Sequence, residues 1–541
     1  MIIDSSNIET GKVIATDICI IGAGVAGITV AREFINKDVN VLLLESGGLE
    51  PNPELQTLNT GKNVGTPYYD LDRTRVRAFG GTSHRWIIDI DNEEQGVRLR
   101  GMDSIDFEKR DWVPYSGWPF SKTHLDPYYE RAHEVCKIGP YSYDADHWKS
   151  SDTRTPLPFV NEKVKTTIFQ FTRKNIFYED YRRELDNAKN ITTVLNATAL
   201  KIEASENAKK VKTILTTTRN GKEFRVKATQ FILATGALEI PRLLLLSNDV
   251  MKCGLGNQND LVGRFFMEHP HLWSGVFYPS DPNLYKRAGL YDVHQQNGTP
   301  VMGKLTIDEN VLREEQLLNF TTSIHPVSIP DPNSGVQSLK KIGAAVASGR
   351  KVDDFEGHLK NCIQNFDGIA AAVLRKVAGP HFDKYLDNSS QINAFKLNIM
   401  AEQVPDPESR VMLDNVKDQF GQQKIKLDWK LNSQDIRSIR KAQQIVDNEL
   451  RRSGLGHLEI ELKDDVPPPD IHGGWHNMGT TRMHESPENG VVDPNCRVHG
   501  ILNLFIAGPS VYPTVGYANP VLTAVALSLR LADHLKKQID N

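Results

Sequence analysis

A glycine-rich turn near the start of the chain restricts the fold more than any other feature of the sequence. Residues 17–34 read DICIIGAGVAGITVAREF, an apolar run followed by Gly22, Gly24 and Gly27 and then by an amphipathic segment. In such a strand, turn and helix, the first glycine makes the tight turn, the second lets the backbone approach a pyrophosphate, and the third lets the helix pack close to the strand. This part of the chain is therefore predicted to be a Rossmann-like nucleotide-binding unit.

A second apolar run ends in an acidic residue. Residues 39–46, VNVLLLES, place Glu45 at the end of this predicted strand. A carboxylate in that place can accept hydrogen bonds from the ribose hydroxyls of an adenosine. The strand, helix and acidic strand end together predict a bound dinucleotide, and these residues alone leave FAD and NAD open.

Distant segments supply further strands to the same unit. Residues 228–247 and 501–535 each read as a strand, a glycine turn and an apolar helix, the last helix starting at about Pro520. Alternating polarity in 272–328 and 395–430 predicts antiparallel strands, and 334–387 is predicted to be mostly helical. We therefore expect an α/β protein in which one nucleotide-binding domain is interrupted by insertions.

Composition excludes several classes of function. The 541 residues carry 64 Lys and Arg against 68 Asp and Glu, a net charge of −4, so there is no basic excess for nucleic acid. No apolar run is long enough to span a membrane, and the N-terminus lacks the basic region of a secretory signal, so a cytoplasmic location is expected. Five scattered cysteines form no C-x-x-C pair, and no metal site is predicted.

A polar loop near the end of the sequence carries the candidate base. Residues 473–484, GGWHNMGTTRMH, have no apolar face to bury, so they form an exposed turn or a loop against something that is not protein. His476 has an imidazole, whose unperturbed pKa of about 6.5 suits a general base at neutral pH. His269 and His271, in MEHPH, are interpreted as structural residues that hold a turn between domains.

Seven motifs in this order resemble the GMC (glucose-methanol-choline) family of FAD-dependent oxidoreductases. They are GAGVAG with Glu45, FGGTS, LATGALEIPRLLLLS, VGRFFMEHPH, HNMGTTRM, VVDPNCRVHGILNLFIAG and GYANPVLTAVALSLRLADHL. The forms GGTSHRW, SGWPFS and MGTTRM are most similar to the bacterial branch that contains pyranose oxidase, glycoside oxidases and sugar dehydrogenases. The resemblance implies tightly held FAD and oxidation of an alcohol.

The resemblance also implies an architecture, a Rossmann-like FAD-binding domain with an inserted α+β substrate-binding domain on an antiparallel sheet, as in p-hydroxybenzoate hydroxylase. The expected ranges are 1–100, 190–271 and 472–541 for the FAD-binding domain, 101–189 for a covering segment and 272–471 for the substrate-binding domain.

Family roles carry over to two sets of residues. His476 and Asn519 match the pair that faces the flavin from the substrate side and are the predicted catalytic residues. The predicted cofactor-binding residues are Gly22, Gly24, Gly27, Glu45, Gly80, Gly81, Thr82, Ser83, Ala237, Gly508, Asn519 and Pro520.

The chain departs from the family at two places. In pyranose oxidases a histidine directly before the tryptophan of the GG loop bonds covalently to the flavin, whereas Arg85 stands there in this chain and His84 lies one residue earlier. FAD is therefore expected to be non-covalent. Asn477 replaces a second histidine found in relatives, which leaves His476 as the candidate base.

The expected activity is oxidation of a sugar or glycoside hydroxyl to a carbonyl by hydride transfer to flavin N5, with His476 as general base. Alternatives are a non-redox, FAD-containing lyase of the same fold and an NAD(P)H-dependent flavoprotein reductase or monooxygenase. The expected partners are an alcohol or carbohydrate substrate and an electron acceptor, namely oxygen, a quinone or a redox protein. The sequence leaves the acceptor and the formation of a homo-oligomer open.

Overall fold

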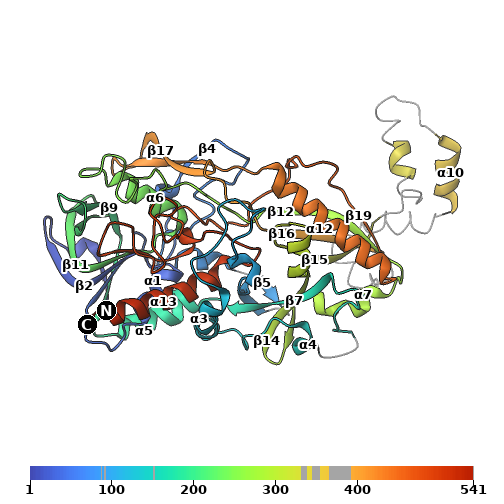
Figure 1. Ribbon diagram of the computed structural model, residues 1–541, viewed down its shortest axis with the longest axis horizontal. Helices are drawn as coiled ribbons and strands as arrows, with labels where there is room; N and C mark the ends of the chain where they lie inside the picture. The colour runs from blue at the N-terminus through green and yellow to red at the C-terminus, as the bar shows by residue number, and fades with distance from the viewer. Residues whose placement is uncertain are drawn as a thin grey trace.

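The computed structural model describes residues 1–86, 88–90, 93–149, 153–329, 338–343, 354–364 and 392–539 (Figure 1). Two large sheets lie side by side along the long axis, and both ends of the described chain lie beside the first of them. Of the predicted helical stretch 334–387, residues 338–343 are helical and α10 spans Phe355–Gln364; apart from residue 354, the rest of the stretch lies outside the described residues.

The first sheet has a parallel core with an antiparallel extension. β2 (Val13–Ile21) pairs in parallel with β3 (Val41–Leu44) and β11 (Glu223–Leu233), and β20 (Leu504–Ile506) pairs in parallel with β11. β11 also pairs antiparallel with β10. The remaining strands are β1 (Ile2–Asp4), β8 (Ile191–Leu195), β9 (Ala197–Ala204) and β10 (Val211–Thr218), in the order β1-β8-β3-β2-β11-β10-β9.

Apolar sequence explains why these strands are central. Ile18 to Ile21 of β2 are almost wholly buried, because both faces of this half of the strand are covered. On one face α1 (Val25–Arg32) packs against α13 (Pro520–Ile539), which in turn packs against α3 (Lys122–Val135). Segments from both ends of the sequence thus form one core, as the sequence predicts.

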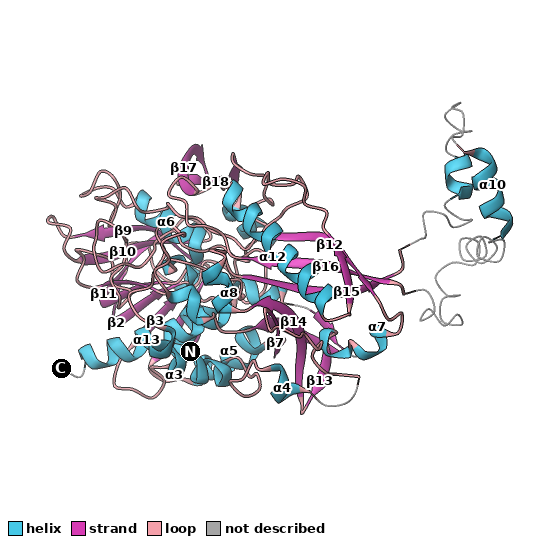
Figure 2. Cartoon of the chain, turned by 45° about the vertical axis from the view of Figure 1, so that its right-hand side comes forward, coloured by secondary structure: helices cyan, strands magenta, loops and turns pink. Residues whose placement is uncertain are grey.

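The second sheet is antiparallel and has one apolar face. Its order is β19-β12-β16-β15-β14-β7-β6-β5, with β13 beside β14. α12 (Ser433–Arg452) runs across it in Figure 2 and covers an apolar cluster that includes Leu305, Ile324 and Leu397. The strands are β5 (Ile88–Ile90), β6 (Glu93–Leu99), β7 (Val164–Arg173), β12 (His271–Pro279), β13 (His294–Gln296), β14 (Thr299–Ile307), β15 (Phe320–Val327), β16 (Ala394–Ala401) and β19 (Gly456–Glu459).

This second sheet crosses the predicted domain boundaries. β5 and β6 come from the range 1–100, and β7 comes from 101–189, yet all three pair within the sheet built from 272–471. A third, small sheet joins β4 (Gly61–Asn63) to β18 (Gln423–Asp428) and β17 (Arg410–Lys417). The α/β class is confirmed. The domain ranges remain a prediction, and strands from three of the predicted ranges pair within this one sheet.

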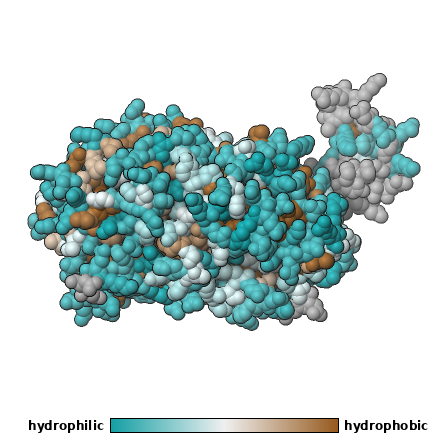
Figure 3. Space-filling view, in the orientation of Figure 1, coloured by the Kyte–Doolittle hydropathy of each residue, from teal (hydrophilic) through white to brown (hydrophobic). Residues whose placement is uncertain are grey.

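No helix in the described part of the chain is both long enough and apolar enough to cross a membrane. The face shown in Figure 3 is largely hydrophilic, with apolar side chains scattered over it.

Candidate active site

A cavity of about 480 Å³ opens at the carboxyl ends of the parallel strands. Its walls include the last residues of β2 and β3, the residues that follow β11 and β20, and, from the second sheet, Arg98 and His271. Ligands of open α/β sheets bind outside the carboxyl ends of the strands. The cavity therefore lies where a nucleotide is expected to bind, with space for a substrate beside it.

The three glycines of the first turn differ in the room around them. A Cβ on Gly22, which has φ +105°, would lie 2.6 Å from the Ala234 carbonyl oxygen, and one on Gly27 would lie 2.0 Å from the Gly22 carbonyl oxygen. A Cβ on Gly24 would meet no protein atom within 4 Å, and Gly24 lines the cavity. This free space at the start of α1, where backbone N–H groups are unpaired, fits a pyrophosphate.

Glu45 lies at the end of β3 and lines the same cavity. Its carboxylate accepts hydrogen bonds from the Ala23 and Gly47 backbone N–H groups, at 2.9 and 2.8 Å. Burial raises the pKa of Glu45, and the hydrogen bonds oppose this shift. These hydrogen bonds hold the carboxylate beside the glycine turn, where an adenosine ribose is expected.

The GG loop presents one of its two basic residues to the cavity. Thr82 and Arg85 line it, whereas His84 stacks on Tyr178, with ring centroids 4.0 Å apart. The His84 Nε2 atom also lies 2.8 Å from the Phe79 carbonyl oxygen. The histidine nearest to the expected linking position is therefore held by protein groups.

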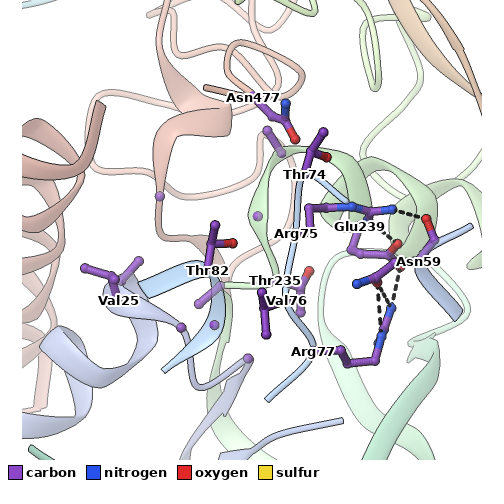
Figure 4. Close-up of a pocket in the computed structure, with 18 of the residues that line it drawn as sticks. Val25, Asn59, Thr74, Arg75, Val76, Arg77, Thr82, Thr235, Glu239 and Asn477 are labelled. Carbon is purple, nitrogen blue, oxygen red and sulfur yellow. Dashed lines mark hydrogen bonds and ion pairs between the residues drawn. The ribbon is translucent and has the colours of Figure 1, made fainter. Parts of the chain in front are cut away.

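A cluster of charged side chains on the cavity wall was not identified from the sequence (Figure 4). Glu239, near the start of α6 (Gly236–Leu246), is 2.5 Å from an Arg75 nitrogen and 3.5 Å from an Arg77 nitrogen. Arg77 also donates to Asn59 Oδ1 at 2.8 Å. The alternation of arginines in RTRVRAF, just before the GG loop, is the signal that could have indicated it.

His476 and Asn519 meet at the substrate end of the cavity. The Asn519 Nδ2 atom donates to His476 Nε2 at 2.9 Å, and His476 Nδ1 lies 2.9 Å from His269 Nδ1. His269 Nε2 is 3.3 Å from the Val515 carbonyl oxygen, which can only accept. In neutral rings the proton therefore lies on His269 Nε2 and on His476 Nδ1, which leaves His476 Nε2 as a proton acceptor.

The loop that carries His476 is held by a buried carboxylate. Glu268 Oε2 accepts from the Gly474 and His476 backbone N–H groups, at 3.0 and 2.9 Å. Its other oxygen accepts from the Tyr68 hydroxyl and from Asn477 Nδ2. Burial raises the pKa of Glu268 to about 7. Glu268 thus fixes the main chain at Gly474 and His476 and the side chain of Asn477.

The histidines at this end are neutral. Burial, with His269, Arg98 and Lys304 nearby, holds the pKa of His476 well below its usual value. Burial lowers the pKa of His269 to about 4 and that of His271 well below its usual value. From the sequence, His269 and His271 were interpreted as structural. Both lie against the candidate base, so the interpretation leaves out their contact with His476.

The predicted site residues fall into two groups. Gly27, Gly80 and Ser83 do not line the cavity. The residues that line the cavity are Gly22, Gly24, Glu45, Gly81, Thr82, Ala237, His476, Gly508, Asn519 and Pro520. Among the residues that the structure describes, no group of three or more His, Cys, Asp or Glu is arranged to hold a metal ion.

Two protein-family models match this chain, one in its amino-terminal part and one in its carboxyl-terminal part. Residues 17–251 match the family model described as FAD dependent oxidoreductase, and residues 405–528 match the one described as GMC oxidoreductase. The large subunit of fructose dehydrogenase from Gluconobacter japonicus is 23% identical, over 97% of this chain and 98% of its own. A C-glycoside 3-oxidase from Arthrobacter globiformis is 33% identical, but over 24% of this chain and 25% of its own.

Solved structures show the same fold. A formate oxidase covers 98% of this chain, with 99% of its own residues matched, a TM-score of 0.53 and 17% identity. A pyridoxine 4-oxidase from Mesorbium loti covers 96% of this chain and 99% of its own, with a TM-score of 0.50 and 16% identity.

The glycine turn, the cavity at the strand ends and the first family match define an FAD-dependent oxidoreductase. With the carboxyl-terminal match and the relatives above, the chain is similar to the GMC oxidoreductases, enzymes of the class that acts on CH–OH groups.

Proposed function

We propose that the enzyme oxidises a sugar or glycoside hydroxyl to a carbonyl, with His476 as the general base and Asn519 as the residue that orients the hydroxyl. When bound, FAD supplies the acceptor for the hydride, at flavin N5. The remaining chemistry is removal of the hydroxyl proton, which the side chains of the protein must perform.

The observation that carries the proposal is the direction of the hydrogen bonds around His476. The unprotonated Nε2 atom lines the cavity, and the bond from Nδ1 to His269 keeps the ring in that tautomer. Asn519 Nδ2 already donates toward Nε2, so its amide can donate to a substrate oxygen that enters there. Base and orienting donor thus act on one hydroxyl.

The substrate class rests on relatives. The fructose dehydrogenase subunit and the C-glycoside 3-oxidase are named for sugars or glycosides, and Trp475, 38% exposed, offers an aromatic face at the cavity. Oxygen, a quinone or a redox protein would each serve as electron acceptor. The cytoplasmic location expected from the sequence stays a prediction.

Anaerobic stopped-flow reduction of the FAD-loaded enzyme, with one sugar that reduces the parent, tests the two roles. His476→Ala should retain FAD and slow flavin reduction by roughly 10²- to 10⁴-fold, the usual contribution of a positioned base. Asn519→Ala should cost less, about 5- to 150-fold, because the base remains.

His457→Ala is the matched control, since that imidazole is exposed on β19. Its reduction rate should equal that of the parent. If His476→Ala holds its flavin and is reduced as fast as the parent, the base lies elsewhere and the assignment fails.

A further inference from the structure

Two cationic side chains of the second sheet lie near the candidate base without a carboxylate partner. Arg98, on β6, lines the cavity, and Lys304, on β14, is 1% exposed. The Arg98 Nε atom is buried without a hydrogen-bond partner. Neither side chain forms an ion pair with any described residue.

Strand register places both on the same face of the sheet. Arg98 pairs with Phe171 of β7, and Lys304 pairs with Thr167 of the same strand. Phe171 and Thr167 are four residues apart, so their side chains share a face. Leu305, the residue after Lys304, lies in the core beneath α12, so Lys304 points to the opposite face, which carries His271 and faces the cavity.

The electrostatic surroundings agree that neither group has a carboxylate close by. Burial lowers the pKa of Arg98, and no neighbouring carboxylate offsets the shift. Burial, and then repulsion by Arg98, hold the pKa of Lys304 well below its usual value. In contrast, the buried Arg110 donates to Glu402 at 2.8 Å. A buried cation without an anion is costly, so its retention at a cavity calls for a ligand that neutralises it.

The groups around the pair offer no protein anion for this role. His476, His271 and His325 all feel the positive charge of Arg98 and Lys304, and each has a lowered pKa. Glu268 is engaged by the 474–477 loop. The substrate end of the cavity therefore combines a neutral base with the Arg98 guanidinium, and Lys304 lies buried near it without a carboxylate partner.

We infer that the alcohol substrate carries an anionic group, a carboxylate or a phosphate, which Arg98 and Lys304 bind while its hydroxyl meets His476. The inference rests on the proposed function and narrows it to acidic sugars or their phosphate esters. The Arg98 guanidinium offers a planar pair of donors to such a group, and Lys304 adds a point charge.

Binding and reduction are measured on the FAD-loaded enzyme under anaerobic conditions, with D-glucose, D-glucuronate and D-glucose 6-phosphate. Calorimetry should show at least tenfold tighter binding of one or both acidic sugars than of D-glucose, and flavin reduction should follow the same order. The acid that binds more tightly identifies the anionic group as carboxylate or phosphate. In Arg98→Gln and Lys304→Met the preference should fall to near unity.

Lys304→Met has a second readout that does not depend on turnover. Because it removes a buried polar group that has no carboxylate partner, it should raise the melting temperature of the substrate-free enzyme. Lys165→Met, an exposed lysine of β7 paired with Asp308 at 2.6 Å, is the matched control and should keep the preference.

Equal binding of D-glucose and both acids by the parent overturns the inference, as does a preference that survives both substitutions. These results leave the proposed function intact, because the effect of His476→Ala on reduction is measured separately. If His476→Ala is reduced as fast as the parent while acidic sugars still bind preferentially, the proposed function fails and the anion site stands.

Discussion

At the scale of single residues, the site depends on which ring nitrogen carries a proton. Val515 fixes the proton of His269, and His269 fixes that of His476. The His476 Nε2 atom is then unprotonated and accepts a hydrogen bond from Asn519 beside the cavity. His269 does not line the cavity. It is a positioning residue that selects the basic tautomer of its neighbour.

The pH dependence of flavin reduction follows from the depressed pKa of His476. A base must be neutral to act, and a group with a lowered pKa stays neutral until the pH falls below its usual value of 6.5. The reduction rate should therefore stay constant from pH 8 to pH 6.5 and decline only at more acidic pH. Stopped-flow reduction across this range measures it.

His269→Ala supplies the comparison. Without its acceptor, the His476 ring is free to turn, so reduction should slow at every pH, while FAD stays bound. A rate that already falls between pH 8 and pH 6.5 in the parent would contradict the assigned environment of His476.

Sequence reasoning proposed His476 and Asn519, which the structure brings together at the cavity, but it missed the residues that support them. Family motifs mark positions that face the flavin, whereas Glu268 reaches the His476 loop across 208 positions of sequence. No local spacing encodes such a contact. The depressed pKa was missed for the same reason, since it comes from burial among groups of three distant segments.

At the scale of elements, two glycines in the N-terminal strand, turn and helix have different roles, one in packing and one in leaving space for the cofactor. Gly27 packs the helix against the strand, and Gly24 leaves space in the cavity. Gly24→Ala should leave the melting temperature of the FAD-free protein unchanged and weaken FAD binding, because the added methyl group takes space expected for the pyrophosphate. Flavin fluorescence titration of the FAD-free protein measures the affinity.

Gly48→Ala is the control, because the nearest atom to its Cβ would be 3.8 Å away and Gly48 does not line the cavity. Gly27→Ala should instead lower the melting temperature, with or without FAD. Normal FAD affinity in Gly24→Ala would show that the phosphates bind elsewhere.

The elements themselves were predictable to different degrees. The parallel strands were found because buried apolar runs next to glycine turns mark them locally. The membership of β5, β6 and β7 in the second sheet was not predicted, since sheet partners are chosen by contacts between distant segments. Local sequence does explain the start of α12, because the Asn432 side chain caps it by accepting from the Gln434 and Asp435 N–H groups.

At the scale of the whole molecule, FAD is expected to act as a reversible ligand that joins distant segments. His84 is held by Tyr178 and Phe79, and Arg85 stands at the linking position, so we expect no covalent bond. Acid precipitation should release the flavin into the supernatant. A yellow pellet whose flavin-bearing peptide contains His84 would contradict this.

The same ligand should stabilise the fold. Saturation at 100 times the dissociation constant adds about 2.7 kcal/mol, so FAD-free protein should melt a few degrees lower and recover when FAD is added back. Addition of NAD in place of FAD serves as the control and should give no recovery.

The nucleotide sheet is completed only by β20 and α13, from the far end of the described sequence. During synthesis, β2 and the glycine turn leave the ribosome long before these partners exist, and the whole antiparallel sheet is made in between. The cavity walls from 507 to 524 are also absent until then. Capture of the cofactor must therefore wait until residues 507–524 have been made, and a nascent chain must keep the part of β11 that pairs with β20 protected until then.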